Sequence, residues 1–206
     1  MRSRAPWLLA ALVVASFIIL LALAVASAQA LAKNTAQYVG CSNPLQAVGG
    51  YRTVSTVDAF RRTYDTNGGT VERWADPTNV LWERFDAELA AHVSKYGKPM
   101  DVIWFQLCVV KARPVTDQDA RDVVTLIRQR LPVATIYVSP LGEPCDKADL
   151  PYGRYLTDLL VNEGLVLRGP VFVPLKPSEV RADNCHPNAE GKLVLGQQMA
   201  DFFDPL

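Results

Sequence analysis

The sequence DVIWFQLCVV at residues 101–110 contains the continuous apolar run Val102-Ile103-Trp104-Phe105. Such a run is expected of a strand that is covered on both faces, as in a parallel sheet. A second run, Val133 to Val138, is rich in β-branched residues. Between the two runs, Thr116 with Asp119 predicts a helix N-cap, and Pro132 ends the helix. The apolar face of this helix consists of Val123, Val124, Ile127 and Leu131.

The same alternation continues on both sides of this unit. Gln37 to Gly40 is strand-like and stops at Cys41-Ser42-Asn43-Pro44, where Asn-Pro marks a turn. Further helices are predicted over residues 79–96, 151–163 and 188–203, and a short strand over Val171 to Val173. The first of these helices has a predicted apolar face of Leu81, Phe85, Leu89 and Val93, with His92 on the same face as a core residue. Helices that alternate with buried strands predict an α/β fold, a parallel sheet flanked by helices.

Length and charge narrow the class of protein. The chain has 206 residues, and its 21 basic residues balance its 21 acidic residues. A neutral balance gives no electrostatic basis for binding nucleic acid. The length fits one domain, at residues 31–206, behind a distinct N-terminal segment at residues 1–30.

The N-terminal segment predicts export. Arg2 and Arg4 precede an apolar run from Trp7 to Ala26, and Ala28-Gln29-Ala30 matches a signal-cleavage site. The run is also long enough to span a bilayer, which needs about 20 apolar residues. Cleavage and retention as a signal anchor therefore both stay open, and we favour cleavage. In either case the remaining chain lies outside the cytoplasm.

The four cysteines are Cys41, Cys108, Cys145 and Cys185. In an oxidising compartment an even number of cysteines predicts disulfides. Zinc binding by the cysteines is the alternative to disulfides. No Cys-x-x-Cys pair is present, however, so we expect no metal. Several pairings are possible, and spacing alone does not choose among them.

Two short segments carry residues suited to nucleophilic catalysis. In Asp183-Asn184-Cys185-His186-Pro187-Asn188, the carboxylate of Asp183 can turn back to accept the imidazole N–H of His186 and fix its tautomer. In Gly40-Cys41-Ser42-Asn43, Ser42 lies at a strand-to-helix turn, where its hydroxyl is exposed at the carboxyl end of the sheet. Taken alone, each segment also fits a purely structural role. Asp183 and His186 would then belong to a surface loop, and Ser42 would be a helix N-cap.

Together the two segments resemble the first and last motif blocks of the SGNH (GDSL-type) hydrolase family, with Cys41 in place of the usual aspartate. Asn67-Gly68-Gly69-Thr70 is similar to the second block. The resemblance implies a three-layer α/β/α, flavodoxin-like fold and an ester hydrolase with no cofactor. It implies a triad of Ser42, His186 and Asp183, and an oxyanion hole formed by the N–H groups of Ser42 and Gly68, with Gly69 as the alternative to Gly68.

The third block departs from the family pattern. The family has Gly-x-Asn-Asp after its third strand, whereas this chain has Gln106-Leu107-Cys108-Val109. Losing one oxyanion donor lowers the rate by about 10²–10³. We therefore expect weak activity or a substitute donor, with Gln106 and Asn43 as alternatives.

The resemblance also suggests how the cysteines pair. The family fold makes the strands before Cys41 and Cys108 neighbours, so we expect Cys41 to bridge to Cys108 and Cys145 to Cys185. A free catalytic thiol at Cys108 or Cys185 is the chemical alternative, which an oxidising compartment disfavours.

The functional expectation is an exported serine esterase that acts on an acyl or acetyl ester of a carbohydrate or lipid. Two alternatives stay open: a non-catalytic binding module of the cell envelope, and an acyltransferase to a sugar acceptor. We expect a monomer that contacts the membrane only through an uncleaved N-terminal segment. Trp74 and Trp82 are expected to pack, or to line a substrate surface. Lys111 and Arg113 are expected to be solvated, or to meet an anionic substrate.

Overall fold

The computed structural model describes residues 35–206 and contains one parallel four-stranded sheet. Its strands lie in the order β1 (Ala36–Val39), β2 (Val102–Leu107), β3 (Thr135–Pro140) and β4 (Leu167–Arg168). Every residue of β1 and β2 is buried, as the continuous apolar run in β2 predicted. The predicted α/β class, with a parallel sheet between helices, is therefore confirmed.

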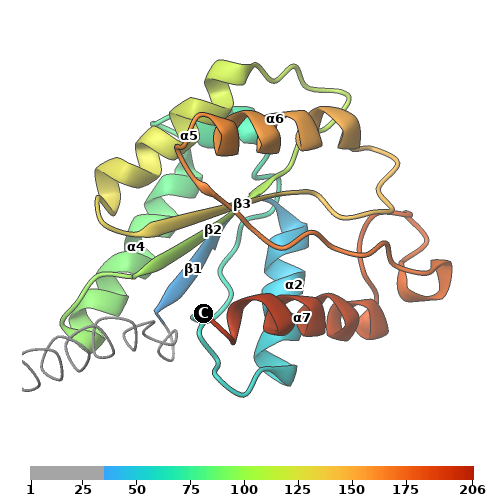
Figure 1. The fold of residues 1–206 in the computed structure, drawn as a ribbon, viewed down its shortest axis with the longest axis horizontal. Helices are drawn as coiled ribbons and strands as arrows, with labels where there is room; N and C mark the ends of the chain where they lie inside the picture. Colours follow the sequence, from blue (N-terminus) through green and yellow to red (C-terminus); the bar gives the residue numbers. More distant parts are fainter. Residues whose placement is uncertain (1–34) are drawn as a thin grey trace, which may run out of the picture. The chain divides into compact units, whose positions relative to one another are not determined.

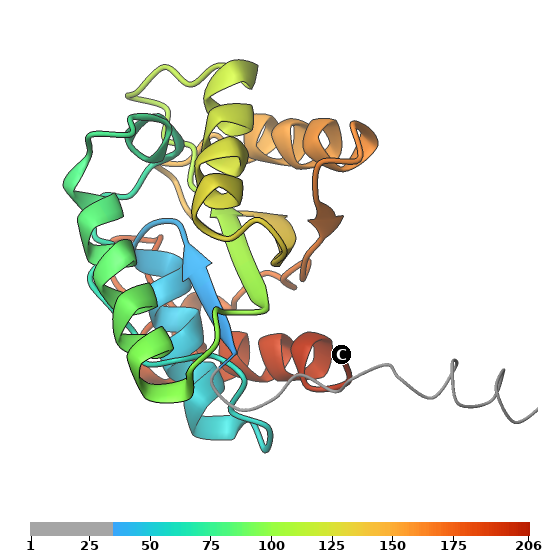
Figure 2. The same ribbon diagram turned by 90° about the vertical axis from the view of Figure 1, so that its left-hand side faces the viewer.

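Helices cover both faces of this sheet and make a three-layer α/β/α arrangement (Figure 1). On one face lie α2 (Ser42–Val54) and α7 (Ala189–Phe203), and on the other lie α5 (Asp117–Arg130) and α6 (Leu150–Asn162) (Figure 2). The remaining helical elements are α3 (Val71–Ala75), α4 (Val80–Tyr96) and the short 3-10 helix η1 (Pro177–Glu179).

Local capping explains why these helices begin where the sequence predicts them. The Thr116 hydroxyl accepts a hydrogen bond from the Asp119 N–H, and the Asp119 carboxylate accepts one from the Thr116 N–H, which makes a capping box. The Asn79 and Asn188 side chains accept from N–H groups in the first turns of α4 and α7. Gly97 closes α4 in the left-handed conformation.

Two local predictions were wrong. Val171 to Val173 forms no strand, and the last strand is Leu167–Arg168 instead. The Gly169 N–H still donates to the Val138 carbonyl, but Pro170 has no N–H to continue the ladder. The turn predicted at Asn43-Pro44 is in fact the first turn of α2. Proline is tolerated there because the N–H groups of a first turn have no partner within the helix.

The buried face of α4 also differs from the predicted one. Leu81 and Phe85 are fully buried as predicted, but Val93 is 46% exposed. His92 is buried as predicted, and Glu88 is buried on this face as well. The Glu88 carboxylate tolerates burial because it pairs with two arginines, Arg61 at 3.5 Å and Arg62 at 2.9 Å.

Burial of His92 predicts a stability that depends on pH. Burial lowers the pKa of His92, and the nearby charge of Arg61 lowers it further. Lys98 acts in the same direction, and Asp101 opposes both. The unfolded chain therefore binds a proton at His92 more readily than the folded chain does, so the folded state should lose stability as pH falls below about 6.5.

We expect urea unfolding to reveal this effect as a smaller loss of stability in His92→Phe than in the wild type between pH 7.5 and pH 5.5. Phenylalanine keeps the ring contact with Tyr96 and removes the titrating group. Equal losses in the two proteins would contradict the assignment, because they would place the acid sensitivity elsewhere.

The predicted signal sequence or anchor at residues 1–30 lies outside the described residues. Between residues 35 and 206, no helix combines the length and the apolar character that crossing a bilayer requires.

Candidate active site

Three side chains from distant parts of the sequence form a hydrogen-bonded chain at the carboxyl end of the sheet. The Ser42 hydroxyl oxygen lies 2.7 Å from Nε2 of His186. On the other side of the ring, Nδ1 of His186 lies 2.5 Å from a carboxylate oxygen of Asp183. Because an ionised carboxylate only accepts, Nδ1 carries the proton and Nε2 is left to accept from the serine hydroxyl. The structure thus brings together the three residues that the sequence predicted.

Asp183 and His186 are placed by a tight local turn. One oxygen of the Asp183 carboxylate accepts from the backbone N–H groups of Cys185 and His186, while the other faces the imidazole. Asn184 between them has a φ of 46°, a conformation that asparagine adopts more readily than most residues. The backbone N–H and then the ring of His186 hold the pKa of Asp183 well below its ordinary value. This carboxylate therefore stays charged throughout the neutral range.

A close helix crossing brings the histidine to the serine. Ser42 is the first residue of α2, and His186 lies just before α7. The two helices meet at Gly50 and Gly196, where a Cβ on Gly50 would lie 1.8 Å from the Lys192 carbonyl oxygen. A Cβ on Gly196 would lie 2.2 Å from the carbonyl carbon of Gly50. Only glycine permits this approach, so the crossing depends on both residues.

The two predicted oxyanion donors are the backbone N–H groups of Ser42 and Gly68. Ser42 occupies the first turn of α2, and its N-cap Cys41 makes no capping hydrogen bond through its side chain. The partial positive charge of a helix N-terminus favours an anion there. Gly68, at a φ of 72°, donates no hydrogen bond from its N–H among residues 35–206. The N–H of Gly69 donates to the Thr66 carbonyl at 3.0 Å, which leaves Gly68 as the better donor of the two.

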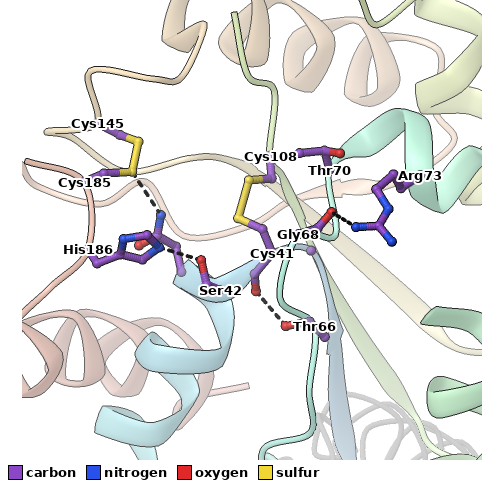
Figure 3. The surroundings of a disulfide bond; sticks show 12 residues. Cys41, Ser42, Thr66, Gly68, Thr70, Arg73, Cys108, Cys145, Cys185 and His186 are labelled. Atoms are coloured by element: carbon purple, nitrogen blue, oxygen red, sulfur yellow. Dashed lines mark hydrogen bonds between the residues drawn. A yellow bond between two sulfur atoms is a disulfide. The ribbon is translucent and has the colours of Figure 1, made fainter. Parts of the chain in front are cut away.

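The two disulfides are Cys41–Cys108 and Cys145–Cys185, the predicted pairing, and no cysteine among the described residues is free. One bridge lies next to Ser42 and the other next to His186 (Figure 3). Both pack into one buried cluster with Leu141 and Ala148. The bridges therefore connect the turn before Ser42 to the end of β2, and the loop that carries His186 to the segment after β3.

Asn43 and Gln106 are the two candidates for a substitute oxyanion donor. No hydrogen bond among the described residues directs either side chain toward Ser42. The Asn43 amide nitrogen lies 3.8 Å from Sγ of Cys185. Gln106 is buried, its side-chain oxygen has no partner among residues 35–206, and it lines a small cavity with Asn43 and Phe172. The contacts of Asn43 and Gln106 among the described residues therefore identify neither side chain as an oxyanion donor.

The other side chains singled out in the sequence have partners within the protein. Trp74 and Trp82 are buried and pack edge to face, as expected of core residues, so neither is exposed to line a substrate surface. Lys111 donates to the Asp146 carbonyl, and Arg113 pairs with Glu72. Among residues 35–206, no cluster of His, Cys, Asp and Glu suits a metal ion.

Sequence reasoning did not predict that Trp74 and Thr66 hold the backbone that leads into Ser42. The Trp74 indole N–H donates to the Gly40 carbonyl, and the Thr66 hydroxyl donates to the Cys41 carbonyl. Both side chains are fully buried. Thr66 carries no signal beyond its position just ahead of Asn67-Gly68-Gly69.

Comparison of the sequence with known proteins identifies no relative of this chain. No protein family matches the chain, and no curated protein is significantly similar to it.

Removal of the Cys41–Cys108 bridge should destabilise the fold. The bridge closes a loop with a sequence separation of 67, so its loss in Cys41→Ala/Cys108→Ala should lower the free energy of unfolding by about 2–4 kcal/mol. Urea unfolding measures the change. The second bridge can be compared in the same way. Cys145→Ala/Cys185→Ala opens a loop with a sequence separation of 40 and should lower the free energy of unfolding by a comparable amount. A wild-type protein that is fully modified by a thiol reagent without prior reduction would contradict both bridges.

Proposed function

We propose that the protein is a serine ester hydrolase of the SGNH type. The observation that carries the proposal is the continuous chain from the Ser42 hydroxyl through the His186 ring to the Asp183 carboxylate, at 2.7 Å and 2.5 Å. A serine in this arrangement has a general base within proton-transfer reach, and that base is oriented by a third group.

In the proposed reaction, Ser42 Oγ attacks the carbonyl carbon of an ester while its proton passes to Nε2 of His186. The charge that develops on the carbonyl oxygen is stabilised by the N–H groups of Ser42 and Gly68. His186 then protonates the departing alcohol, which leaves an acyl group on Ser42. Water, activated by the same histidine, releases the acid and restores the serine. Asp183 stays ionised and stabilises the imidazolium in both steps.

The proposed setting is outside the cytoplasm, as a secreted or membrane-anchored protein. Two disulfides among the described residues are compatible with an extracellular protein. The proposed substrate is an acyl or acetyl ester of a carbohydrate or a lipid, the range that the family resemblance implies.

A non-catalytic binding module is the second candidate, and one observation favours it. Cys108 belongs to a disulfide at the end of β2, where the family has the asparagine that supplies the third oxyanion donor. The intact hydrogen-bonded triad favours the enzyme, since a module without chemistry has no need to orient a histidine toward a serine.

Turnover of p-nitrophenyl acetate tests the proposal against this second candidate. Purified protein with both disulfides formed should release p-nitrophenolate faster than buffer does, and a sugar acceptor should leave the ratio of acetate to p-nitrophenolate at one. A fall in that ratio would indicate acyl transfer instead. No release above buffer, over a series of short-chain esters, would favour the binding module.

A further inference from the structure

The two peptide groups that lead into Ser42 are both held by buried side chains, one from the loop before α3 and one from α3 itself. The Trp74 indole N–H donates to the Gly40 carbonyl at 2.9 Å. The Thr66 hydroxyl donates to the Cys41 carbonyl at 2.6 Å (Figure 3). Both donors are completely removed from solvent. Both are side-chain to backbone hydrogen bonds, not backbone bonds of a helix or a sheet. They connect residues 66–74 to the backbone of residues 40–41.

The contact with Thr66 matters because of the geometry of one peptide group. The Cys41 carbonyl and the Ser42 N–H belong to the same planar, trans peptide unit, so they point in opposite directions. A hydroxyl that holds the carbonyl therefore also sets the direction of the N–H. Donation to the carbonyl oxygen further polarises the peptide group and strengthens the N–H as a donor.

The same residue also closes the turn that presents the second N–H. The Gly69 N–H donates to the Thr66 carbonyl at 3.0 Å, and Gly68, with its positive φ, lies inside this turn. A Cβ on Gly69 would lie 2.2 Å from the Gly40 carbonyl oxygen, so this turn packs in close contact with the backbone just before Ser42. Thr66 thus contacts the backbone on both sides of the oxyanion hole.

We propose that Thr66 is a positioning residue that aims the Ser42 N–H at the oxyanion by holding the Cys41 carbonyl. This inference rests on the proposed ester hydrolysis and adds a residue to it that no motif identifies. Because the N–H interacts with the oxyanion more strongly than with the ground-state carbonyl, the hydroxyl of Thr66 should matter for the chemical step and not for substrate binding.

The test compares Thr66→Val with Thr66→Ser in p-nitrophenyl acetate turnover. Valine has nearly the shape of threonine but no hydroxyl, whereas serine keeps the donor. We expect kcat of Thr66→Val to fall on the order of 10-fold, less than the 10²–10³ typical when an oxyanion donor is deleted, with KM unchanged within about twofold. Thr66→Ser should restore most of kcat. Affinity for an alkyl boronic acid, which forms a tetrahedral adduct on serine, should fall in parallel with kcat.

Thr157→Val is the matched control, because Thr157 is also fully buried and its hydroxyl donates to a backbone carbonyl, that of Gly153 in α6. This variant should lose comparable stability and keep wild-type kcat. Wild-type kcat in Thr66→Val, or equal losses of kcat in both valine variants, would overturn the positioning role of Thr66. The proposed ester hydrolysis would not be affected by either result. If Ser42→Ala hydrolyses the ester as fast as the wild type, the proposed hydrolysis fails, and the role of Thr66 fails with it.

Discussion

Ser42→Ala is expected to reduce kcat/KM for p-nitrophenyl acetate by about 10⁴-fold or more, with no change in fold. Removal of the nucleophile of a serine triad leaves only the oxyanion hole and substrate binding, which retain a small part of the rate enhancement. The Ser42 hydroxyl makes a side-chain hydrogen bond only to Nε2 of His186 among the described residues, so its loss should not disturb the surrounding helix. Steady-state kinetics together with circular dichroism measure the two quantities.

Ser55→Ala provides a control at the other end of the same helix. The Ser55 hydroxyl, directly after the last residue of α2, donates to the carboxylate of Asp204, so this substitution also removes a hydrogen bond made by a serine hydroxyl. It should lower stability slightly and leave turnover at the wild-type level. If Ser42→Ala retained more than about a tenth of wild-type activity, the ester hydrolysis would have to proceed at another group.

Asp183→Asn is expected to reduce kcat by about 10⁴-fold while leaving the site in place. An asparagine can keep the backbone contacts of Asp183 to Cys185 and His186. Its amide group, however, permits the ring tautomer in which Nε2 carries the proton, and this tautomer cannot accept from Ser42. The imidazolium that forms during attack also loses its counter-charge.

The pH profile distinguishes this mechanism from simple damage to the loop. The backbone N–H and the ring of His186 hold the pKa of Asp183 well below its ordinary value. A carboxylate with a lowered pKa stays charged above that value, so its charge is present at every pH of a practical assay. Asp183→Asn should therefore be impaired by a similar factor from pH 6 to pH 9. Asp146→Asn, an exposed carboxylate in the loop bridged to Cys185, should retain wild-type kcat. A deficit in Asp183→Asn that disappears at high pH would contradict the assignment.

The parts of the site that sequence could predict are those built from local contacts. Asp183 and His186 are three residues apart, and a single turn closes the hydrogen bond between them. The helix starts at Thr116, Asn79 and Asn188 were predictable for the same reason, because a cap involves only neighbouring residues. The continuous apolar run in β2 identified a strand buried on both faces.

The parts that sequence could not predict depend on contacts between distant segments. Nothing local distinguishes Gly50 and Gly196 from other glycines, yet their crossing brings α7 against α2. Thr66 is one threonine among several until the Cys41 carbonyl is seen to accept from it. The pairing of the cysteines required the order of the strands, which the family resemblance supplied and the spacing did not.

The most direct measurement is the site of covalent modification by a fluorophosphonate, which reacts with a serine hydroxyl only when a neighbouring base activates it. The protein should be labelled with both disulfides intact, and digestion followed by mass spectrometry should place one adduct on the peptide that contains Ser42. His186→Ala should abolish this adduct. A folded, unreduced protein that takes up no label, or takes it up at a residue other than Ser42, would contradict the proposal that these three side chains work as a catalytic triad.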